Sequence, residues 1–275
     1  MNEKYEDAYK TKNHFSFGKN WQKFLESLDE EKINEAKKSL VDFLGGENKI
    51  RGKTFVDIGC GSGLFSLAAF LLGASRVVSV DIDDFSLECA KFLKEKQGSP
   101  KSWEIKKGSA LDENFIKELE TFDVVYSWGV LHHTGDMWRA IGNALTIVKS
   151  DGVFYIAIYN KNERYVLEGT SRLWVSLKRT YNKSGGLMKK GMEAVYILYF
   201  FLGLILHGIN PFSYVRRYSS LRGMDFYTDI RDWLGGYPYE FASINEMKSF
   251  FAKHNFGCEN VKEVRSLGCN EFLFQ

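Results

Sequence analysis

The sequence predicts an α/β fold of the Rossmann-like class, with a seven-stranded, mostly parallel sheet that carries helices on both faces. The first observation is that short β-type runs alternate with helical patterns from residue 54 to residue 158. Such alternation predicts parallel pairing, because each crossover places a helix on a face of the sheet. The second is a glycine-rich turn, 57–63, between the first run and the first helix of this series. The third is that the rhythm stops after Tyr159 and resumes near residue 241, which predicts a largely helical insertion after strand five.

Each element has its own local signal. The β-type runs are 54–58, 76–80, 103–106, 122–127 and 153–158. Apolar positions at three- and four-residue spacing predict helices over 29–44, 64–72, 85–97, 114–119 and 137–148. The motif Ser243–Glu246 has the capping-box pattern and opens a helix that runs to about residue 254. A turn at 150–152 and two final strands, 258–265 and 269–275, complete the prediction.

These elements divide the chain into four parts. Residues 1–48 form an N-terminal arm or lid with a helix, and residues 49–159 form the cofactor-binding core. Residues 160–240 are the insertion, expected on the substrate side. Residues 241–275 return to the core with its last helix and last two strands.

Composition narrows the classes of function. The chain has 275 residues with 37 basic and 35 acidic side chains, a net charge of +2, so no global field attracts nucleic acid. The spacing of the four cysteines fits no zinc site, and no metal is expected. The polar N-terminus has no signal-peptide core. We therefore expect a cytoplasmic protein.

The glycine turn favours a positively charged ligand. Gly59, Gly61 and Gly63 let a ligand lie against bare backbone. A dinucleotide site would space its third glycine one residue later, and its pyrophosphate would gain nothing from the carboxylate of Asp57. A ligand with an ammonium or sulfonium group would be stabilised by this carboxylate. Asp81, at the end of the second run, can accept hydrogen bonds from both ribose hydroxyls of NAD or of S-adenosylmethionine.

Three motifs in order carry a family resemblance. Asp57-Ile58-Gly59-Cys60-Gly61-Ser62-Gly63 resembles motif I of class I S-adenosylmethionine-dependent methyltransferases. Val80–Asp83 resembles their ribose-binding turn, and Phe122–His133 resembles their fourth-strand motif. The resemblance covers roughly 50–160 and 240–275 and is strongest to ubiquinone- and menaquinone-pathway methylases and related small-molecule enzymes.

The resemblance implies S-adenosylmethionine as cofactor and assigns residues to it. Asp57 and the turn would hold the methionine end, Asp81 the ribose, and Ile82 the adenine ring. Many relatives have an acid where Ser109 stands, so Ser109, Asp112 or backbone would meet the adenine amino group. Trp128 is either a cofactor neighbour or a core aromatic residue. The full set implied is Asp57, Gly59, Cys60, Gly61, Gly63, Asp81, Ile82, Ser109, Ala110, Ser127 and Trp128.

Two histidines are candidates for a catalytic base. His132 and His133 follow the fourth strand, at the edge where Rossmann-like sheets bind ligands. Histidine titrates near neutral pH and can take a proton from an acceptor. The alternative is that one ring holds a loop in place. Asp136 would orient a ring or cap the next helix.

The acceptor side is predicted from aromatic and charged residues. An N-terminal segment with Phe17 and Trp21 would act as a lid or as a packing arm, and Tyr159 leaves the fifth strand toward the same edge. The insertion would supply a polar, aromatic-walled pocket, unless its Arg and Asp residues pair with each other. The pocket candidates are Arg222, Tyr227, Arg231, Tyr237 and Tyr239.

The stretch 194–209 is apolar but shorter than a membrane span. Three interpretations remain open: a buried helix, an interfacial helix that rests on a membrane or binds a lipid-linked substrate, and a homodimer contact.

Together these observations predict methyl transfer to a small-molecule or glycan-like acceptor, at oxygen. tRNA methylation is an alternative, supported by Lys178-Arg179, Lys189-Lys190 and Arg216-Arg217 and opposed by the low net charge. A non-catalytic S-adenosylmethionine-binding sensor or membrane-associated scaffold is another. The glycine spacing disfavours an NAD oxidoreductase.

Overall fold

A computed structural model of the chain describes residues 25, 28–163, 169–222, 226–265 and 267–275, with the side chains of 219–222 excepted. Phe17 and Trp21, and with them the predicted lid, lie outside the described residues.

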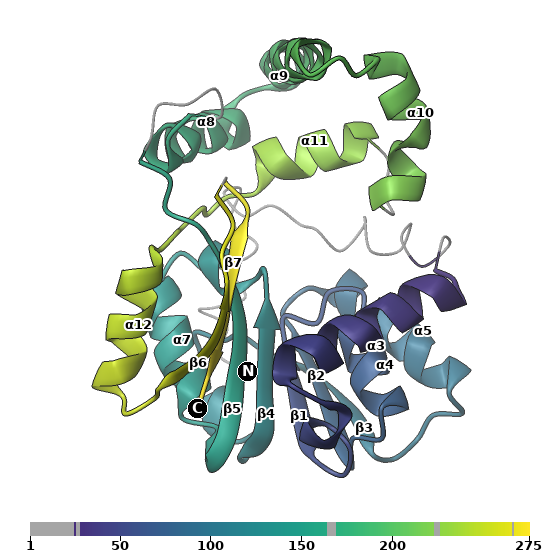
Figure 1. Cartoon of the computed structure of the whole chain (residues 1–275), viewed down its shortest axis with the longest axis vertical. Coiled ribbons are helices and arrows are strands. Elements are labelled where there is room, and N and C mark those ends of the chain that lie inside the picture. The colour runs from purple at the N-terminus through teal and green to yellow at the C-terminus, as the bar shows by residue number, and fades with distance from the viewer. Residues whose placement is uncertain (1–24, 26–27, 164–168, 223–225, 266) are drawn as a thin grey trace.

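The predicted fold class is confirmed by a seven-stranded sheet with the order β3-β2-β1-β4-β5-β7-β6 (Figure 1). Pairs within the β3-β2-β1-β4-β5 part are parallel, and β7 is antiparallel to both β5 and β6. The strands are β1 (Thr54–Ile58), β2 (Arg76–Asp81), β3 (Trp103–Lys107), β4 (Phe122–Trp128), β5 (Val148–Tyr159), β6 (Cys258–Lys262) and β7 (Cys269–Phe274).

Helices cover both faces of the sheet. One face carries α3 (Glu30–Leu44), α4 (Leu64–Leu71) and α5 (Asp84–Lys96); the other carries α6 (Glu113–Lys117), α7 (Met137–Leu145) and α12 (Ile244–Lys253) (Figure 1). A short 3₁₀ turn, η1 (Glu47–Lys49), follows α3. The alternation of strand side chains explains the two cores: Phe55 and Tyr126 pack with α3 and α4, whereas Val56 and Val125 pack with α7 and α12. Ser243 forms the predicted capping box at α12.

Boundaries were predicted wrongly in two places. The strand expected over 258–265 ends at Lys262, as β6. The helix expected over 137–148 ends at Leu145, and β5 begins at Val148 and runs through the predicted turn 150–152. The β4–β5 register shifts between Phe122 and Val124, so the strand starts with an irregularity. Gly152 fits there because a Cβ at this residue would lie 2.9 Å from the carbonyl oxygen of Phe122. Residues 150–152, which are typical of turns, therefore form part of the irregular start of β5.

The insertion is helical, as predicted, and forms a cap beyond the carboxyl ends of the parallel strands (Figure 1). Its helices are α8 (Ser171–Lys183), α9 (Gly186–Leu206), α10 (Pro211–Arg222) and α11 (Phe226–Gly235). The cap has its own core, built around the buried residues Trp174, Tyr181, Tyr218, Phe226, Ile230, Leu234, Tyr239 and Leu267.

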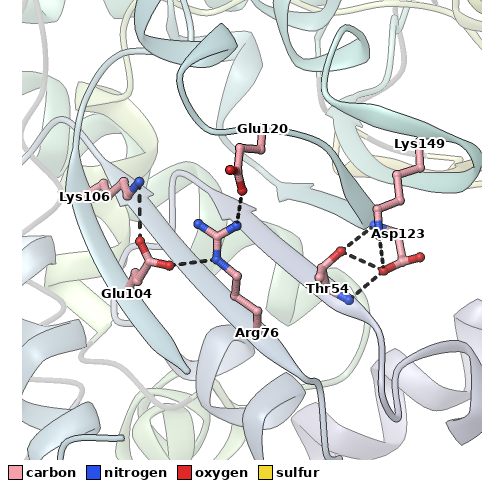
Figure 2. Close-up of polar contacts among 7 residues, drawn as sticks. All are labelled: Thr54, Arg76, Glu104, Lys106, Glu120, Asp123 and Lys149. Atoms are coloured by element: carbon pink, nitrogen blue, oxygen red, sulfur yellow. Dashed lines mark hydrogen bonds and ion pairs between the residues drawn. The ribbon is translucent and has the colours of Figure 1, made fainter. Parts of the chain in front are cut away.

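Polar contacts join the strands at their amino ends (Figure 2). Asp123 Oδ2 accepts hydrogen bonds from the Thr54 backbone N–H (2.8 Å), from Thr54 Oγ1 (2.7 Å) and from Lys149 Nζ (2.9 Å), which ties β1, β4 and β5 together. Arg76 donates to Glu104 (2.7 Å) and Glu120 (2.8 Å). Burial opposes the ionised form of Asp123, but the bonds from Thr54 and Lys149 prevail and lower its pKa to about 2.

We predict that Asp123→Asn lowers the free energy of unfolding at neutral pH by about 1–2 kcal/mol. Because the pKa of Asp123 is lowered from 3.8 to about 2 on folding, its contribution is complete above about pH 4 and is lost toward about pH 2. Urea unfolding at about pH 7, 4 and 3 measures the free energy of unfolding of both proteins, wild type and variant. The control is Asp42→Asn, on an exposed ion pair with Lys38. Equal stability of Asp123→Asn and wild type at neutral pH would contradict the assignment.

Candidate active site

The turn after β1 is shaped by glycine geometry. Gly59, Gly61 and Gly63 have φ values of +77°, +51° and +79°, in the region that glycine adopts without strain. The backbone N–H groups of Gly59 and Cys60 donate to the Val80 carbonyl oxygen at 2.8 and 2.9 Å, so the turn is tied to the end of β2. A Cβ at Gly59 would lie 2.3 Å from Val130 Cγ1. Only glycine fits at position 59, because Val130 packs directly against its Cα.

Asp81 lies at the end of β2, beside this turn. Its Oδ2 accepts from the Gly61 N–H (3.0 Å) and its Oδ1 from the Asp83 N–H (2.9 Å). Each carboxylate oxygen keeps a second lone pair, so two further donors fit. Burial raises the pKa of Asp81 to about 6, against the effect of these two hydrogen bonds.

Asp57 lies beneath the turn and is buried. Ser66 Oγ donates to its Oδ2 (2.7 Å), Ser79 Oγ donates to Ser66 Oγ (2.6 Å), and Trp103 Nε1 donates to Ser79 Oγ (2.8 Å). Burial raises the pKa of Asp57 to about 7; the bond from Ser66 opposes this and the charge of Asp81 adds to it. Two neighbouring carboxylates with raised pKa values favour a cationic ligand or hydroxyl donors.

The residues predicted at the adenine edge follow β2 and β3. Ile82 and Ser109 are half-buried, and the hydroxyl of Ser109 accepts from the Leu111 N–H at 3.2 Å. The carbonyl of Ala110 accepts from Asn143 Nδ2 at 2.9 Å. Asp112 accepts from the N–H groups at the start of α6, so its carboxylate serves as a helix cap.

The two residues predicted at the end of β4 differ in the exposure of their side chains. Ser127 is buried and donates to the Ile58 carbonyl at 2.8 Å, which links β4 to β1. Trp128 is 43% exposed, so its side chain is not a core aromatic residue. Cys60, in the glycine turn, is buried, and burial raises the pKa of its thiol well above the usual value.

The two histidines lie in a short 3₁₀ turn, η2 (Leu131–His133), and have different environments. His132 is 0% exposed, and its Nδ1 accepts from the Tyr159 N–H at 3.3 Å. Burial holds the pKa of His132 well below its usual range, and the charges of His133 and Lys178 lower it further. Its Nε2 has no hydrogen-bond partner among the described residues.

His133 is half-buried, and its Nδ1 lies 2.5 Å from the Pro238 carbonyl oxygen. A carbonyl only accepts, so Nδ1 carries the proton and Nε2 of the neutral ring carries a lone pair. The ring lies edge-on to Tyr159, with centroids 5.5 Å apart.

The predicted acceptor residues divide into two groups. Tyr159, Tyr239 and Tyr237 lie near the histidines: the Tyr159 ring is 4.0 Å from His132 and 4.8 Å from Tyr239, and Tyr237 precedes the proline that His133 contacts. Tyr227 and Arg231 lie on the exposed side of α11.

Arg231 forms an ion pair with Glu193 of α9 at 3.5 Å, so its salt-bridge partner among the described residues is a glutamate of another helix and not the neighbouring Asp that was considered as an alternative. The side chain of Arg222 lies outside the described residues.

Two residues were not predicted to belong to the site. Lys178 is 0% exposed and donates to the Trp233 carbonyl; its Nζ lies 3.9 Å from the Trp233 ring centroid and 4.8 Å from that of Tyr239. Burial lowers the pKa of Lys178 to about 7. The Glu240 carboxylate accepts from the N–H groups of Gly135 and Met137, at the start of α7. Lys178 therefore contributes nothing to the surface charge that was counted in favour of RNA.

Two pockets differ in their position relative to the predicted site residues. One, of about 350 Å³, lies in the cap and is lined mainly by aromatic residues, among them Trp174, Tyr196, Phe200, Tyr214 and Trp233. Trp233 also packs edge-on against Tyr159 with centroids 6.0 Å apart, so this pocket is one ring away from the residues that surround His132. The other, of about 360 Å³, lies against α3, β6 and β7 and contains none of the predicted site residues.

A Rossmann-like sheet with an open glycine turn and an acidic residue at the end of β2 defines a protein that binds a nucleoside-containing cofactor. A family profile described as a methyltransferase domain matches residues 49–197. The chain belongs to this family of methyltransferase domains, and the recognition made from the sequence motifs is confirmed. S-adenosylmethionine, the predicted cofactor, is the methyl donor of the family.

Curated relatives and solved structures agree with this family. A ubiquinone biosynthesis O-methyltransferase of Methylobacterium sp. (strain 4-46) is 32% identical over 119 residues, which are 43% of this chain and 46% of the relative. A ribosomal protein L11 methyltransferase of Staphylococcus saprophyticus is 34% identical over 113 residues, 40% of this chain and 34% of the relative. The chain thus spans about half the length, or less, of the curated relatives it matches.

Two solved structures share the fold. PKMT2 of Rickettsia typhi, in complex with AdoHcy, has a TM-score of 0.58 and 11% identity over 87% of this chain and 52% of that chain. Magnesium protoporphyrin IX methyltransferase of Synechocystis PCC 6803, with bound SAH, has a TM-score of 0.51 and 13% identity over 89% of this chain and 85% of that chain.

We predict that Asp81→Asn weakens S-adenosylmethionine binding at least about tenfold, because an amide cannot accept from two hydroxyls through both of its end atoms. In the wild type, affinity should fall as the pH drops through about 6, where the Asp81 carboxylate becomes protonated in the free protein. Calorimetric titrations between about pH 7.5 and 5.5 measure both effects. Asp84→Asn, on an exposed carboxylate paired with Lys107, is the control. Unchanged affinity in Asp81→Asn would remove this residue from the site.

Proposed function

We propose that this chain transfers the methyl group of S-adenosylmethionine to an oxygen of a small-molecule acceptor, with His133 as the base. The observation that carries the proposal is the Pro238 contact, which places the proton of His133 on Nδ1, so that Nε2 of the neutral ring has the lone pair that a base needs. The name of the Methylobacterium relative, an O-methyltransferase of ubiquinone biosynthesis, supports a small acceptor and an oxygen target.

The cofactor fits the residues present. We assign both carboxylate oxygens of Asp81 to the ribose hydroxyls, and the turn Gly59, Cys60, Gly61 and Gly63 to the methionine end. Asp57, buried beneath the turn, would stabilise the positive charge above it through space. Ile82, Ser109 and Ala110 would face adenine, and Ser127 and Trp128 the sulfur side, as proposed contacts.

When held by Asp81 and the glycine turn, the cofactor would supply an electrophilic methyl group to the acceptor oxygen, and S-adenosylhomocysteine would be the leaving group. The hydroxyl proton passes to Nε2 of His133, which helps because an alkoxide or phenolate is the better nucleophile. The rings of Tyr159 and Tyr239 exclude water beside this base.

His132 has a different proposed role. Because its ring is fully buried and its Nδ1 already accepts from the Tyr159 backbone, it orients the turn that carries His133. Its carbonyl accepts from the Glu240 N–H at 2.9 Å, which joins the turn to the end of the cap segment. His132 is therefore a positioning residue in this proposal.

The acceptor would lie under the cap, against Tyr159, Tyr237 and Tyr239. Aromatic walls stack on another aromatic ring or on the apolar face of a sugar, so the proposal includes glycan-like acceptors. We propose that Tyr227 and Arg231 lie at the outer end of the acceptor region, where Arg231 pairs with Glu193.

A protein acceptor is the second candidate, because the Staphylococcus relative is a ribosomal protein L11 methyltransferase by name. RNA as acceptor is disfavoured, since Lys178 is buried in its aromatic cage and the net charge is only +2. We also propose a cytoplasmic location, at the membrane periphery, which fits four free cysteines.

We predict that His133→Ala lowers turnover about 100-fold and leaves S-adenosylmethionine affinity within about twofold, because a base acts only in the reaction step. S-adenosylhomocysteine formation is measured with a panel of phenols, hydroxy acids and sugars, and affinity by calorimetry. His254→Ala, on an exposed ring at the end of α12, is the control. Full turnover in His133→Ala would exclude His133 as the base. A wild type that binds the cofactor but forms no S-adenosylhomocysteine with any acceptor would favour a sensor or scaffold.

A further inference from the structure

Helix α9 is apolar on two opposite sides. Its inner side, including Tyr196, Ile197 and Phe200, packs on the core of the cap. Its outer side carries a stripe at three- and four-residue spacing, with Val195 70% exposed, Leu198 61%, Leu202 53% and Ile205 58%. None of its 21 residues is buried. A surface helix normally presents charged residues to water, so the outer stripe lacks the partner that its composition requires.

The apolar surface continues past the end of α9. Leu206 is 75% exposed, and Phe212, at the start of α10, is 72% exposed. No single helix among the described residues is long and apolar enough to cross a membrane; α9 and α10 together meet the length and composition test, but they are bent by 112° at the break between them. The outer stripe of α9 and these two residues are called the α9 face below.

The charge of this segment favours an anionic surface. Lys189 and Lys190 precede the stripe, and Arg216 and Arg217 follow it on α10. Between residues 185 and 222 the sequence contains one acidic residue, Glu193, whose carboxylate accepts from the Tyr181 hydroxyl at 2.6 Å and pairs with Arg231. Basic residues that flank an exposed apolar stripe along the sequence are typical of segments that bind a bilayer with anionic lipids.

The same charges disfavour a second copy of this chain as the partner. A symmetric contact through the α9 face would bring two equal sets of basic residues together, and the one acidic residue within 185–222 of each copy is already paired. A bilayer with anionic headgroups instead supplies both the apolar medium and the counter-charge.

We propose that the α9 face docks on the surface of a membrane that contains anionic lipids. The aromatic pocket of the cap is lined by the inner side of the same helix, through Tyr196, Tyr199 and Phe200, and reaches Trp233. Tyr199 is also 39% exposed beside the stripe. Docking would therefore place this pocket next to the lipid phase, from which an acceptor with an apolar chain can enter toward Tyr159. This last step rests on the proposed function; the docking itself does not.

Vesicle co-sedimentation tests the docking with the full chain. We expect at least about tenfold more binding to vesicles of phosphatidylcholine with about 30% phosphatidylglycerol than to vesicles of phosphatidylcholine alone, and less binding at high salt. The double variant Leu198→Glu/Leu202→Glu should lose this binding. Arg216→Ala/Arg217→Ala should lose about tenfold on the anionic vesicles only.

The matched control is Leu71→Glu/Phe92→Glu, which places the same charges on α4 and α5 of the core, where these side chains are 41% and 45% exposed. It should bind vesicles as the wild type does. Circular dichroism and S-adenosylmethionine calorimetry, which also report on the proposed function separately, verify that each variant is folded.

Three outcomes would overturn the proposal. The wild type fails to bind anionic vesicles; the α9 variant binds them as well as the wild type; or light scattering shows a wild-type dimer that the α9 variant dissociates while vesicles capture neither protein. The last result would assign the α9 face to a second copy.

Discussion

The Val80 carbonyl oxygen holds the arrangement on which the site depends. Because it accepts from both Gly59 and Cys60, the chain must turn back over the end of β2 as soon as β1 ends. The left-handed glycines make this turn free of strain, and it brings Asp57 and Asp81 to one side of the sheet. Burial raises both pKa values, and the charge of Asp81 adds to the shift of Asp57. A cationic ligand would offset this cost, so the site favours a ligand with a positive charge.

A second set of contacts decides how the cap meets the core. The segment 237–240 returns from α11 and binds the turn after β4 through backbone, carbonyl and carboxylate groups: Glu240 N–H to His132, Pro238 oxygen to His133, and the Glu240 carboxylate to the start of α7. The proposed base and the residues proposed to surround the acceptor are therefore held in place by the same segment, 237–240. A change in the cap is expected to act on the chemistry as well as on acceptor choice, since both rest on these few bonds.

The cap uses its apolar residues in two ways. Its inner aromatic rings form a core that buries Lys178, which has no salt bridge among the described residues; ring faces and the Trp233 carbonyl stabilise the ammonium, and its pKa falls to about 7. Its outer apolar residues on α9 face solvent. Both features agree with the proposal that the cap meets an acceptor with a large apolar or aromatic part.

Local signals in the sequence determined the sheet, its helices, the glycine turn and the methyl donor, because strand alternation, helix periodicity and turn chemistry all act between near neighbours. They failed at residues 145–152, where a strand irregularity uses turn-type residues. Tertiary structure alone decided that His132 is buried while His133 meets the Pro238 carbonyl, that Lys178 is buried, and that Arg231 pairs with Glu193. The reason is distance along the chain: His133 meets Pro238 across 105 residues, and Lys178 meets Trp233 across 55. No local pattern in the sequence predicts such long-range contacts, because they form only when the cap folds and packs on the sheet.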